Sequence, residues 1–381
     1  MRKGLAIMLI TIFGSLVLLG LALFIASDNY AQFGASPSGE RLERIMSSPN
    51  FNGQKFVNSL PSSIGNPGHF WEAVNKIFFG PELRSPEMEL PVVPIDSAAF
   101  ASQPPSGLRI TWLGHSTVLV EMDGLRILTD PVWSKRASPF VFPGPARFFD
   151  VPIAITDLPA LDAVVISHDH YDHLDKNAVV SLAKTGVNFI LPLGVGAHLE
   201  KWGIAAEQIS ELDWWESWTD HTNRLQITAT PARHFSGRGP LTGNHTLWAS
   251  WVFAGLLKRV YFSGDTGPFP GFEEIGTRYG PFDITLVKIG AYNKGWPDIH
   301  LNPDQALDAH LALRGRLLQP IHWGTFNLAF HDWYEPAVWL LREARERNIP
   351  IVIPRPGEQV DPVAPPEVQE WWLPDVREPA E

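Results

Sequence analysis

The stretch Ser167-His168-Asp169-His170-Tyr171-Asp172-His173-Leu174-Asp175 follows directly on the apolar run Leu161-Asp162-Ala163-Val164-Val165-Ile166. Its side chains that can bind a transition metal fall within six positions, at His168, His170, Asp172 and His173. A strand places alternate side chains on one face, so His168 and His170 are expected to converge on one metal ion. A turn after them is expected to deliver Asp172 and His173 to a neighbouring site.

Three further ligand-type residues occupy a similar setting, because each follows an apolar run of strand character. They are His234 after residues 225–229, Asp265 after residues 259–262, and His322 after residues 317–320. Ligand sites in open α/β sheets collect at the carboxyl ends of strands, so these side chains are expected to meet around one cleft. Asp265 has two carboxylate oxygens and can bridge two cations. The sequence therefore predicts a dinuclear metal centre.

The composition is that of a globular protein, with 381 residues, 45% hydrophobic and 19% charged. A formal net charge of −11 argues against nucleic acid as a partner, since affinity for a polyanion comes mainly from clustered cations. Cysteine is absent. A transition metal must therefore be held by imidazole and carboxylate groups.

Apolar runs of strand type alternate with helical patterns between residues 108 and 353, which predicts a layered α/β architecture. Asp123-Gly124 indicates a tight hairpin. Strands are expected at 108–112, 117–122, 125–129, 163–167, 188–192, 225–229, 247–253, 259–262, 284–289 and 317–320. Helices are expected at 176–184, 195–202, 303–312 and 336–347.

The amino-terminal run from Gly4 to Ser27 carries no charged residue over 24 positions and follows Arg2 and Lys3. A helix of this length would span about 36 Å, enough to cross a hydrocarbon core of about 30 Å. The run predicts a single-pass transmembrane helix, with the cations before it placing the catalytic domain outside the cytoplasm. A cleaved signal segment and a secreted protein are the alternative.

The rest of the chain divides into three expected parts. Residues 28–105 form an amino-terminal extension, either packed on the core or facing a membrane, with a helix expected near residues 70–79. Residues 106–360 form the catalytic domain. Residues 361–381 form an acidic tail rich in proline, which cannot make a long regular element.

The motif from His168 to His173 resembles the His-x-His-x-Asp-His signature of the metallo-β-lactamase fold superfamily. Within that superfamily the chain is most similar to the N-acyl-phosphatidylethanolamine-hydrolysing phospholipases D. The resemblance runs from about Leu108 to Glu358. It includes residues 117–123, 128–131, 136–139, 211–216, 272–276 and 321–326.

The resemblance implies a four-layer αββα sandwich in which two sheets pack face to face with helices outside. It also implies two zinc ions, with Asp265 bridging them. One is held by His168, His170 and His234, and the other by Asp172, His173 and His322. Fe²⁺ and Mn²⁺ accept the same nitrogen and oxygen ligands.

The implied activity is cleavage of a phospholipid phosphodiester bond, with a hydroxide that bridges the metals as the nucleophile. The substrate would be N-acyl-phosphatidylethanolamine at a membrane, and the products N-acylethanolamine and phosphatidic acid. Asp172 and Asp265 are the expected catalytic carboxylates. A lactonase or other carboxylic-ester hydrolase is one alternative, and a non-catalytic metal-binding membrane scaffold is another.

Three further residues are expected to contact an anionic substrate: Lys288 after residues 283–287, Arg233 beside the ligand His234, and His300 before a predicted helix. His115 is interpreted as a structural residue.

Overall fold

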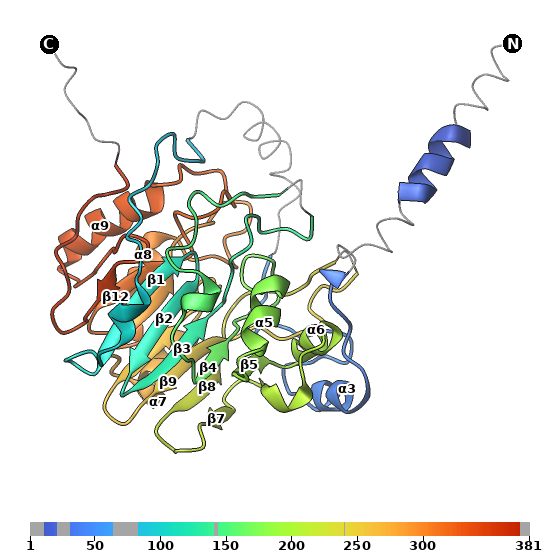
Figure 1. Ribbon diagram of the computed structural model, residues 1–381, viewed down its shortest axis with the longest axis horizontal. Coiled ribbons are helices and arrows are strands. Elements are labelled where there is room, and N and C mark those ends of the chain that lie inside the picture. Colours follow the sequence, from blue (N-terminus) through green and yellow to red (C-terminus); the bar gives the residue numbers. More distant parts are fainter. Residues whose placement is uncertain (1–10, 21–30, 64–82, 141–143, 240, 374–381) are drawn as a thin grey trace, which may run out of the picture.

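Two β-sheets pack face to face with helices on both outer sides in this computed structural model (Figure 1). The structure describes residues 11–20, 31–63, 83–140, 144–239 and 241–373. The seven-stranded sheet has the order β13-β1-β2-β3-β4-β5-β6, and the six-stranded sheet has the order β12-β11-β10-β9-β8-β7. The expected α/β architecture with two stacked sheets is confirmed.

The seven-stranded sheet contains a meander followed by parallel strands. The pairs β1–β2 and β2–β3 are antiparallel, whereas β3, β4, β5 and β6 run parallel. The strands are β1 (Leu108–Gly114), β2 (Thr117–Met122), β3 (Leu125–Thr129), β4 (Ala163–Val165), β5 (Asn188–Pro192), β6 (Ile209–Leu212) and β13 (Gln359–Val360).

The six-stranded sheet combines a parallel half and an antiparallel half. Strands β10, β11 and β12 are parallel, while β7, β8 and β9 extend the sheet in antiparallel pairs. The strands are β7 (Ser217–Thr219), β8 (Gln226–Thr230), β9 (Ser250–Ala254), β10 (Arg259–Phe262), β11 (Ile284–Lys288) and β12 (Leu318–Ile321).

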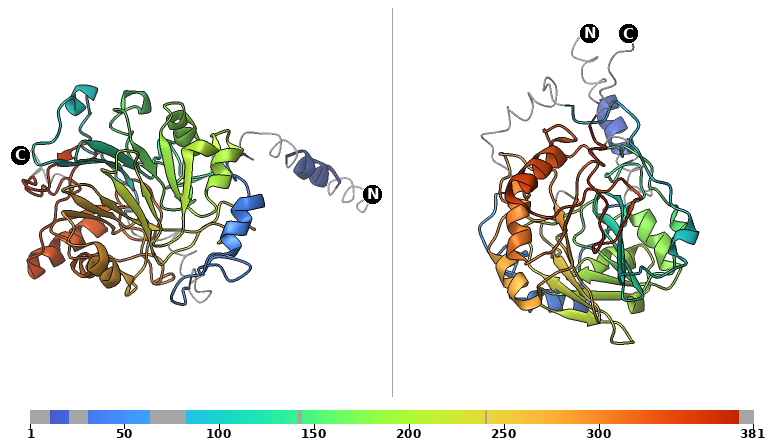
Figure 2. Two further views of the ribbon diagram at one scale, coloured as in Figure 1. Left: turned by 90° about the horizontal axis from the view of Figure 1, so that it is seen from below. Right: turned by 90° about the vertical axis from the view of Figure 1, so that its left-hand side faces the viewer.

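The helices form the two outer layers, as the end-on view in Figure 2 shows. Helices α5 (Lys176–Ala183) and α6 (Gly196–Lys201) cover the seven-stranded sheet, and α7 (Gly271–Tyr279), α8 (Pro303–Ala312) and α9 (Glu335–Arg347) cover the other. Helix α3 (Gly39–Met46) precedes the sheets. Short 3-10 helices are η2 (Ser97–Phe100), η3 (Ile155–Asp157) and η4 (Ala206–Gln208).

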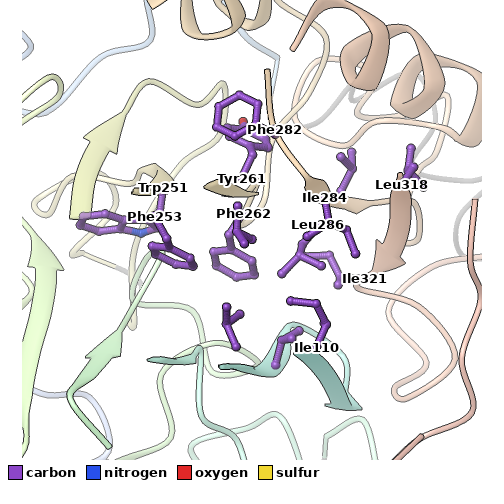
Figure 3. Packing of buried hydrophobic residues seen from close by; sticks show 14 of the residues in the cluster. Ile110, Trp251, Phe253, Tyr261, Phe262, Phe282, Ile284, Leu286, Leu318 and Ile321 are labelled. Atoms are coloured by element: carbon purple, nitrogen blue, oxygen red, sulfur yellow. The ribbon is translucent and has the colours of Figure 1, made fainter. Parts of the chain in front are cut away.

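The main hydrophobic core lies between the two sheets. Phe262, Leu286 and Ile321 of the six-stranded sheet point toward Ile110 of the facing sheet (Figure 3). A second cluster fills the space between the seven-stranded sheet and α5. Because both faces of the central strands are covered, all residues of β2 and β11 are buried, and most of them are apolar or β-branched.

Most of the expected elements are present, and those missed are short or peripheral. Strands β6, β7 and β13, together with helices α3 and α7, were not predicted from the sequence. In β7 none of the three residues is buried, so the strand lacks the hydrophobic alternation by which edge strands are found. The strand β7 forms because its backbone pairs with that of β8.

The expected membrane-spanning helix is not supported by the structure, and the prediction of a membrane-anchored protein is corrected. Among the described residues no helix is long and apolar enough to cross a bilayer. Residues 11–20 are helical, which corresponds to only about 15 Å of helix. The remaining residues of the apolar run lie outside the described ranges. The expected orientation, with the catalytic domain outside the cytoplasm, depended on that helix and is therefore not supported either.

The described parts of the amino-terminal extension pack against the sheets. Ile45, Phe56 and Leu90 are buried in the main core. The helix expected near residues 70–79 lies outside the described residues. In the carboxy-terminal tail, Trp371 and Trp372 join the same core, where both rings pack against Trp323.

Candidate metal centre

The predicted ligands gather where the carboxyl ends of several strands meet. His168 follows β4, Asp265 follows β10 and His322 follows β12. The strands β10, β11 and β12 are parallel and therefore end at the same edge of their sheet. This arrangement lets residues from distant parts of the chain enter one site.

Three histidines meet in the first ligand group. Nε2 of His168 lies 2.7 Å from Nδ1 of His170, and Nε2 of His234 lies 3.3 Å from the same atom. His168 and His234 are buried. Their approach brings three imidazole nitrogens to one point.

The second ligand group contains two histidines and two carboxylates. Nε2 of His322 lies 3.0 Å from Oδ2 of Asp265 and 3.4 Å from Oδ2 of Asp172. Nε2 of His173 lies 3.4 Å and 3.5 Å from the same oxygens of Asp172 and Asp265. Oδ2 of Asp265 also lies 3.7 Å from Nε2 of His234. Asp265 therefore stands between the two groups.

These spacings suit a metal ion. A tetrahedral zinc ion with bonds of about 2.0–2.1 Å keeps its ligand atoms about 3.3 Å apart, close to the distances in the second group. Nε2 of His173, Nε2 of His322 and Oδ1 of Asp265 are buried without a hydrogen-bond partner in the described part of the chain. Buried polar atoms rarely stay unpaired. The cluster is therefore able to bind metal.

In His173 and His234 the ring nitrogen that faces away from the cluster is held by a hydrogen bond. Nδ1 of His173 lies 2.6 Å from Oδ2 of Asp130, and the Ser167 hydroxyl donates to the same oxygen at 2.6 Å. Nδ1 of His234 donates to the backbone oxygen of Ile299 at 3.0 Å. With the proton on Nδ1, the Nε2 atom of each ring keeps a lone pair for a metal ion.

The carboxylates of the cluster favour a positive charge on the groups beside them. Burial opposes ionisation of Asp265, but His322 and His173 lower its pKa well below the ordinary value. The pKa of Asp172 is lowered in the same way, against burial, chiefly by His173. Burial also opposes the charged form of His173, yet Asp265 and Asp172 raise its pKa well above the ordinary value. A divalent cation would supply the positive charge that this cluster favours.

Two buried side chains hold the histidine loop against its neighbour. Nη1 of Arg238 donates to the backbone oxygens of Asp169 at 2.7 Å and Leu174 at 2.9 Å. The Asp169 carboxylate accepts the N–H of Gly237 at 2.7 Å. These contacts tie the loop that carries His168 to the loop that carries His234.

Gly264 permits the close approach of the turn that presents Asp265. Its φ is +51°, and an added Cβ would lie 2.5 Å from Cβ of Ser167. A side chain at this position would push the two loops apart. His322 adopts a similar left-handed conformation, with φ of 59°, which is uncommon for a residue other than glycine and is a feature of functional sites.

Lys288 lies behind the cluster and is fully buried. Its Nζ donates to the backbone oxygen of Gly290 at 2.5 Å and lies 2.6 Å from Nδ1 of His300. Burial lowers the pKa of Lys288 to about 7. His300 is in turn near the cluster, with Nδ1 at 3.9 Å from Oδ2 of Asp265. The structure thus brings His300 to the site and places Lys288 one residue further back.

Arg233 lies beside the ligand His234, but its guanidinium group contacts other parts of the protein. It forms an ion pair with Asp298 at 2.9 Å and donates to the Ser62 hydroxyl at 3.0 Å and the backbone oxygen of Pro268 at 3.0 Å. It also donates to the backbone oxygen of Pro61. The contacts of its guanidinium group are therefore with Asp298, Ser62 and backbone oxygens, none of which is a predicted ligand.

A cavity of about 270 Å³ opens beside the cluster. Its polar lining comes from the ligands and His300, and its apolar wall from the half-buried side chains of Phe235, Trp296 and Leu328. The cavity therefore has histidines and carboxylates on one side and apolar side chains on the other.

Two residues of the site were not identified as functional from the sequence. His115, expected to be structural, lies with Nε2 at 2.9 Å from Oδ2 of Asp172, and its ring centroid is 4.0 Å from that of His322. Asp130 holds His173, as described above. His115 directly follows β1, and Asp130 directly follows β3. Their position after a strand, the signal that identified His168, could have indicated them.

Comparison with known proteins agrees with this geometry. The family described as "Beta-lactamase superfamily domain" matches residues 125–323. An uncharacterized protein of Mycobacterium tuberculosis (strain H37Rv) is 46% identical over 335 residues, which cover 85% of this chain and 87% of that protein. The N-acyl-phosphatidylethanolamine-hydrolyzing phospholipase D 1 of Caenorhabditis elegans is 42% identical over 270 residues, covering 68% of this chain and 75% of the enzyme.

Among solved structures, a metallo hydrolase from Ignicoccus hospitalis is similar with a TM-score of 0.52 and 25% identity, covering 66% of this chain and 97% of that one. The fold and the cluster of histidines and aspartates agree with the relatives, which are named as hydrolases. The chain belongs to the metallo-β-lactamase superfamily and is a metallohydrolase.

Proposed function

We propose that this protein hydrolyses the phosphodiester bond of N-acyl-phosphatidylethanolamine, releasing N-acylethanolamine and phosphatidic acid. The observation that carries the proposal is the 42% identity to a phospholipase D named for this substrate, over 270 residues. A yeast relative with the same named activity is 35% identical over 234 residues.

The proposed reaction consumes one water molecule. The oxygen of water forms a new bond to phosphorus, and the bond between phosphorus and the ethanolamine oxygen breaks. One proton of the water passes to that leaving oxygen, so phosphatidic acid and the N-acylethanolamine alcohol are formed.

The proposed cofactor is a pair of zinc ions. His168, His170 and His234 would hold one, and Asp172, His173 and His322 the other, with Asp265 shared between them. The supporting observation is the spacing of 3.0 to 3.5 Å between the ligand atoms of the second group. Divalent cations at these positions would lower the pKa of a water molecule and stabilise negative charge on phosphoryl oxygens.

The chain's own groups would orient the substrate. Asp172 lines the cavity, and its carboxylate would accept a hydrogen bond from the attacking water and so orient it. His300 lines the same cavity and would contact the phosphate. Lys288 would act through His300, because its Nζ contacts the ring and is fully buried. Burial lowers the pKa of Lys288 to about 7, and its protonated form would favour an anionic substrate.

Arg233 has a different proposed role from the one expected from the sequence. Its ion pair with Asp298 and its bonds to the segment around Ser62 make it a structural link. The apolar wall of the cavity, formed by Phe235, Trp296 and Leu328, would contact the hydrocarbon part of a lipid next to its head group.

Product analysis by mass spectrometry tests the proposal. The zinc-loaded protein is incubated with a panel of phospholipids and acyl lactones, and Asp172→Asn serves as the inactive reference. Formation of phosphatidic acid and N-acylethanolamine by the wild type alone is expected. Rapid lactone hydrolysis without phosphatidic acid from any lipid would instead assign a carboxylic-ester hydrolase.

A further inference from the structure

The metal ligand His234 is held by a segment that lies far from it in the sequence. The side chain of Asn58 contacts the main chain of His234 on both sides: Oδ1 accepts the His234 N–H at 3.0 Å, and Nδ2 donates to the His234 carbonyl oxygen at 2.7 Å. A side-chain amide offers one acceptor and two donors, so this pair of contacts uses both ends of the group.

The position of the Asn58 amide is itself defined. The indole N–H of Trp248 donates to the same Oδ1 atom at 3.1 Å and to the backbone oxygen of Ala232 at 2.9 Å. Two residues earlier, Phe56 is fully buried, and its backbone N–H donates to the backbone oxygen of Asn244 at 2.9 Å. The anchored Phe56 places the segment, and Asn58 can then hold His234 at little cost in conformational entropy.

The same segment reaches the group that orients the His234 ring. The ring donates from Nδ1 to the backbone oxygen of Ile299. The neighbouring residue Asp298 accepts the N–H of Ser63 at 2.9 Å and pairs with Arg233. Residues 58–63 therefore contact both the backbone of the ligand and the loop that fixes its ring.

We infer that Asn58 is a positioning residue of the metal centre, which sets the backbone of His234 so that Nε2 faces His168 and His170. The inference rests on the ligand set given under the proposed function. Groups that orient a metal ligand from behind commonly change metal affinity by about 10- to 100-fold when they are removed. A loss of that size is expected at the site that contains His234.

The test compares full-length variants loaded with Zn²⁺ or Co²⁺. Asn58→Leu keeps the size of the side chain and removes both hydrogen bonds. Asn58→Asp keeps the acceptor for the His234 N–H but presents an oxygen to the His234 carbonyl. Asn50→Ala is the control, because Asn50 lies in the same segment and donates to Asp213 instead. His234→Ala provides the reference for loss of the ligand itself.

Metal affinity is measured by competition with a chelator, and the visible spectrum of the Co²⁺ form reports the ligand geometry. Asn58→Leu is expected to weaken binding of one metal equivalent by about 10- to 100-fold and to alter the spectrum, with a smaller effect for Asn58→Asp. Thermal unfolding of the metal-free proteins shows whether each variant is folded.

Wild-type affinity and spectrum in both Asn58 variants would overturn the inference, as would an equal loss in Asn50→Ala. If His234→Ala keeps two metal equivalents at wild-type affinity, the proposed ligand set fails and the inference with it. Loss in His234→Ala with no change in Asn58→Leu and Asn58→Asp would leave the ligand set standing and reject the role of Asn58 alone.

Discussion

Nδ1 of His173 lies 2.6 Å from Oδ2 of Asp130, and neither side chain is exposed to solvent. Asp130 follows β3, and His173 belongs to the loop after the parallel strand β4. The hydrogen bond turns the opposite nitrogen, Nε2, toward Asp172 and Asp265. A residue outside the proposed ligand set thereby orients one of the proposed ligands.

Replacing Asp130 with asparagine should weaken metal binding at the site that contains His173. The amide cannot match a carboxylate as acceptor for the imidazole N–H, so a loss of affinity of about 10- to 100-fold is expected. Chelator competition measures it. Asp220→Asn is the control, since Asp220 is a buried aspartate that accepts backbone N–H groups from Thr222 and Leu225. Equal effects of the two substitutions would argue against a specific role for Asp130.

Asp265→Ala should lower the occupancy of both metal positions. Oδ2 of Asp265 lies 3.0 Å from Nε2 of His322 and 3.7 Å from Nε2 of His234, so its removal takes a ligand from each group. Elemental analysis of the purified wild-type protein should give about two metal equivalents per chain, with both reduced in the variant. A single metal per chain that survives the substitution would contradict a dinuclear centre.

Lys288→Met should slow the hydrolysis of N-acyl-phosphatidylethanolamine without changing metal content. The substitution removes the contact to His300 and the positive charge behind the cluster. A decrease in turnover of about tenfold is expected, equivalent to roughly 1.4 kcal/mol of transition-state stabilisation. Lys201→Met, at an exposed position of α6, should retain full activity. Unchanged turnover in Lys288→Met would show that this cation does not assist the reaction.

Folding stability should fall in mild acid because of His310. Burial lowers its pKa from 6.5 to about 4, so between these values the unfolded chain binds a proton that the native protein does not. The contribution of neutral His310 to the free energy of unfolding is therefore fully present above pH 6.5, the pKa in the unfolded chain, and it is lost as the pH falls toward 4. The contribution of this group between pH 7 and pH 5 amounts to about 2 kcal/mol.

Urea unfolding of the metal-free protein at both pH values checks this expectation. His310→Gln should show the smaller decrease in stability from pH 7 to pH 5, whereas His221→Gln, at an exposed site, should behave as the wild type. The same decrease in all three proteins would assign the acid sensitivity to other groups.

Local sequence patterns were sufficient to predict the buried strands and the candidate metal ligands that directly follow them. The buried strands β2 and β11 consist mostly of apolar and β-branched residues, since both of their faces are covered, and this composition indicates a strand without knowledge of the fold. Residues such as His168 and Asp265 were identified because each combines a metal-binding side chain with a position just after a strand. The packed structure brings these residues together, as expected.

The orientation of side chains and the contacts between distant segments were decided by tertiary structure. Lys288 and Arg233 were both expected to contact an anionic substrate, yet the first packs behind His300 and the second pairs with Asp298. Asn58 meets His234 across 176 positions of the chain. No local pattern encodes such contacts, because they depend on which surfaces the two sheets and their loops present to each other when the core forms.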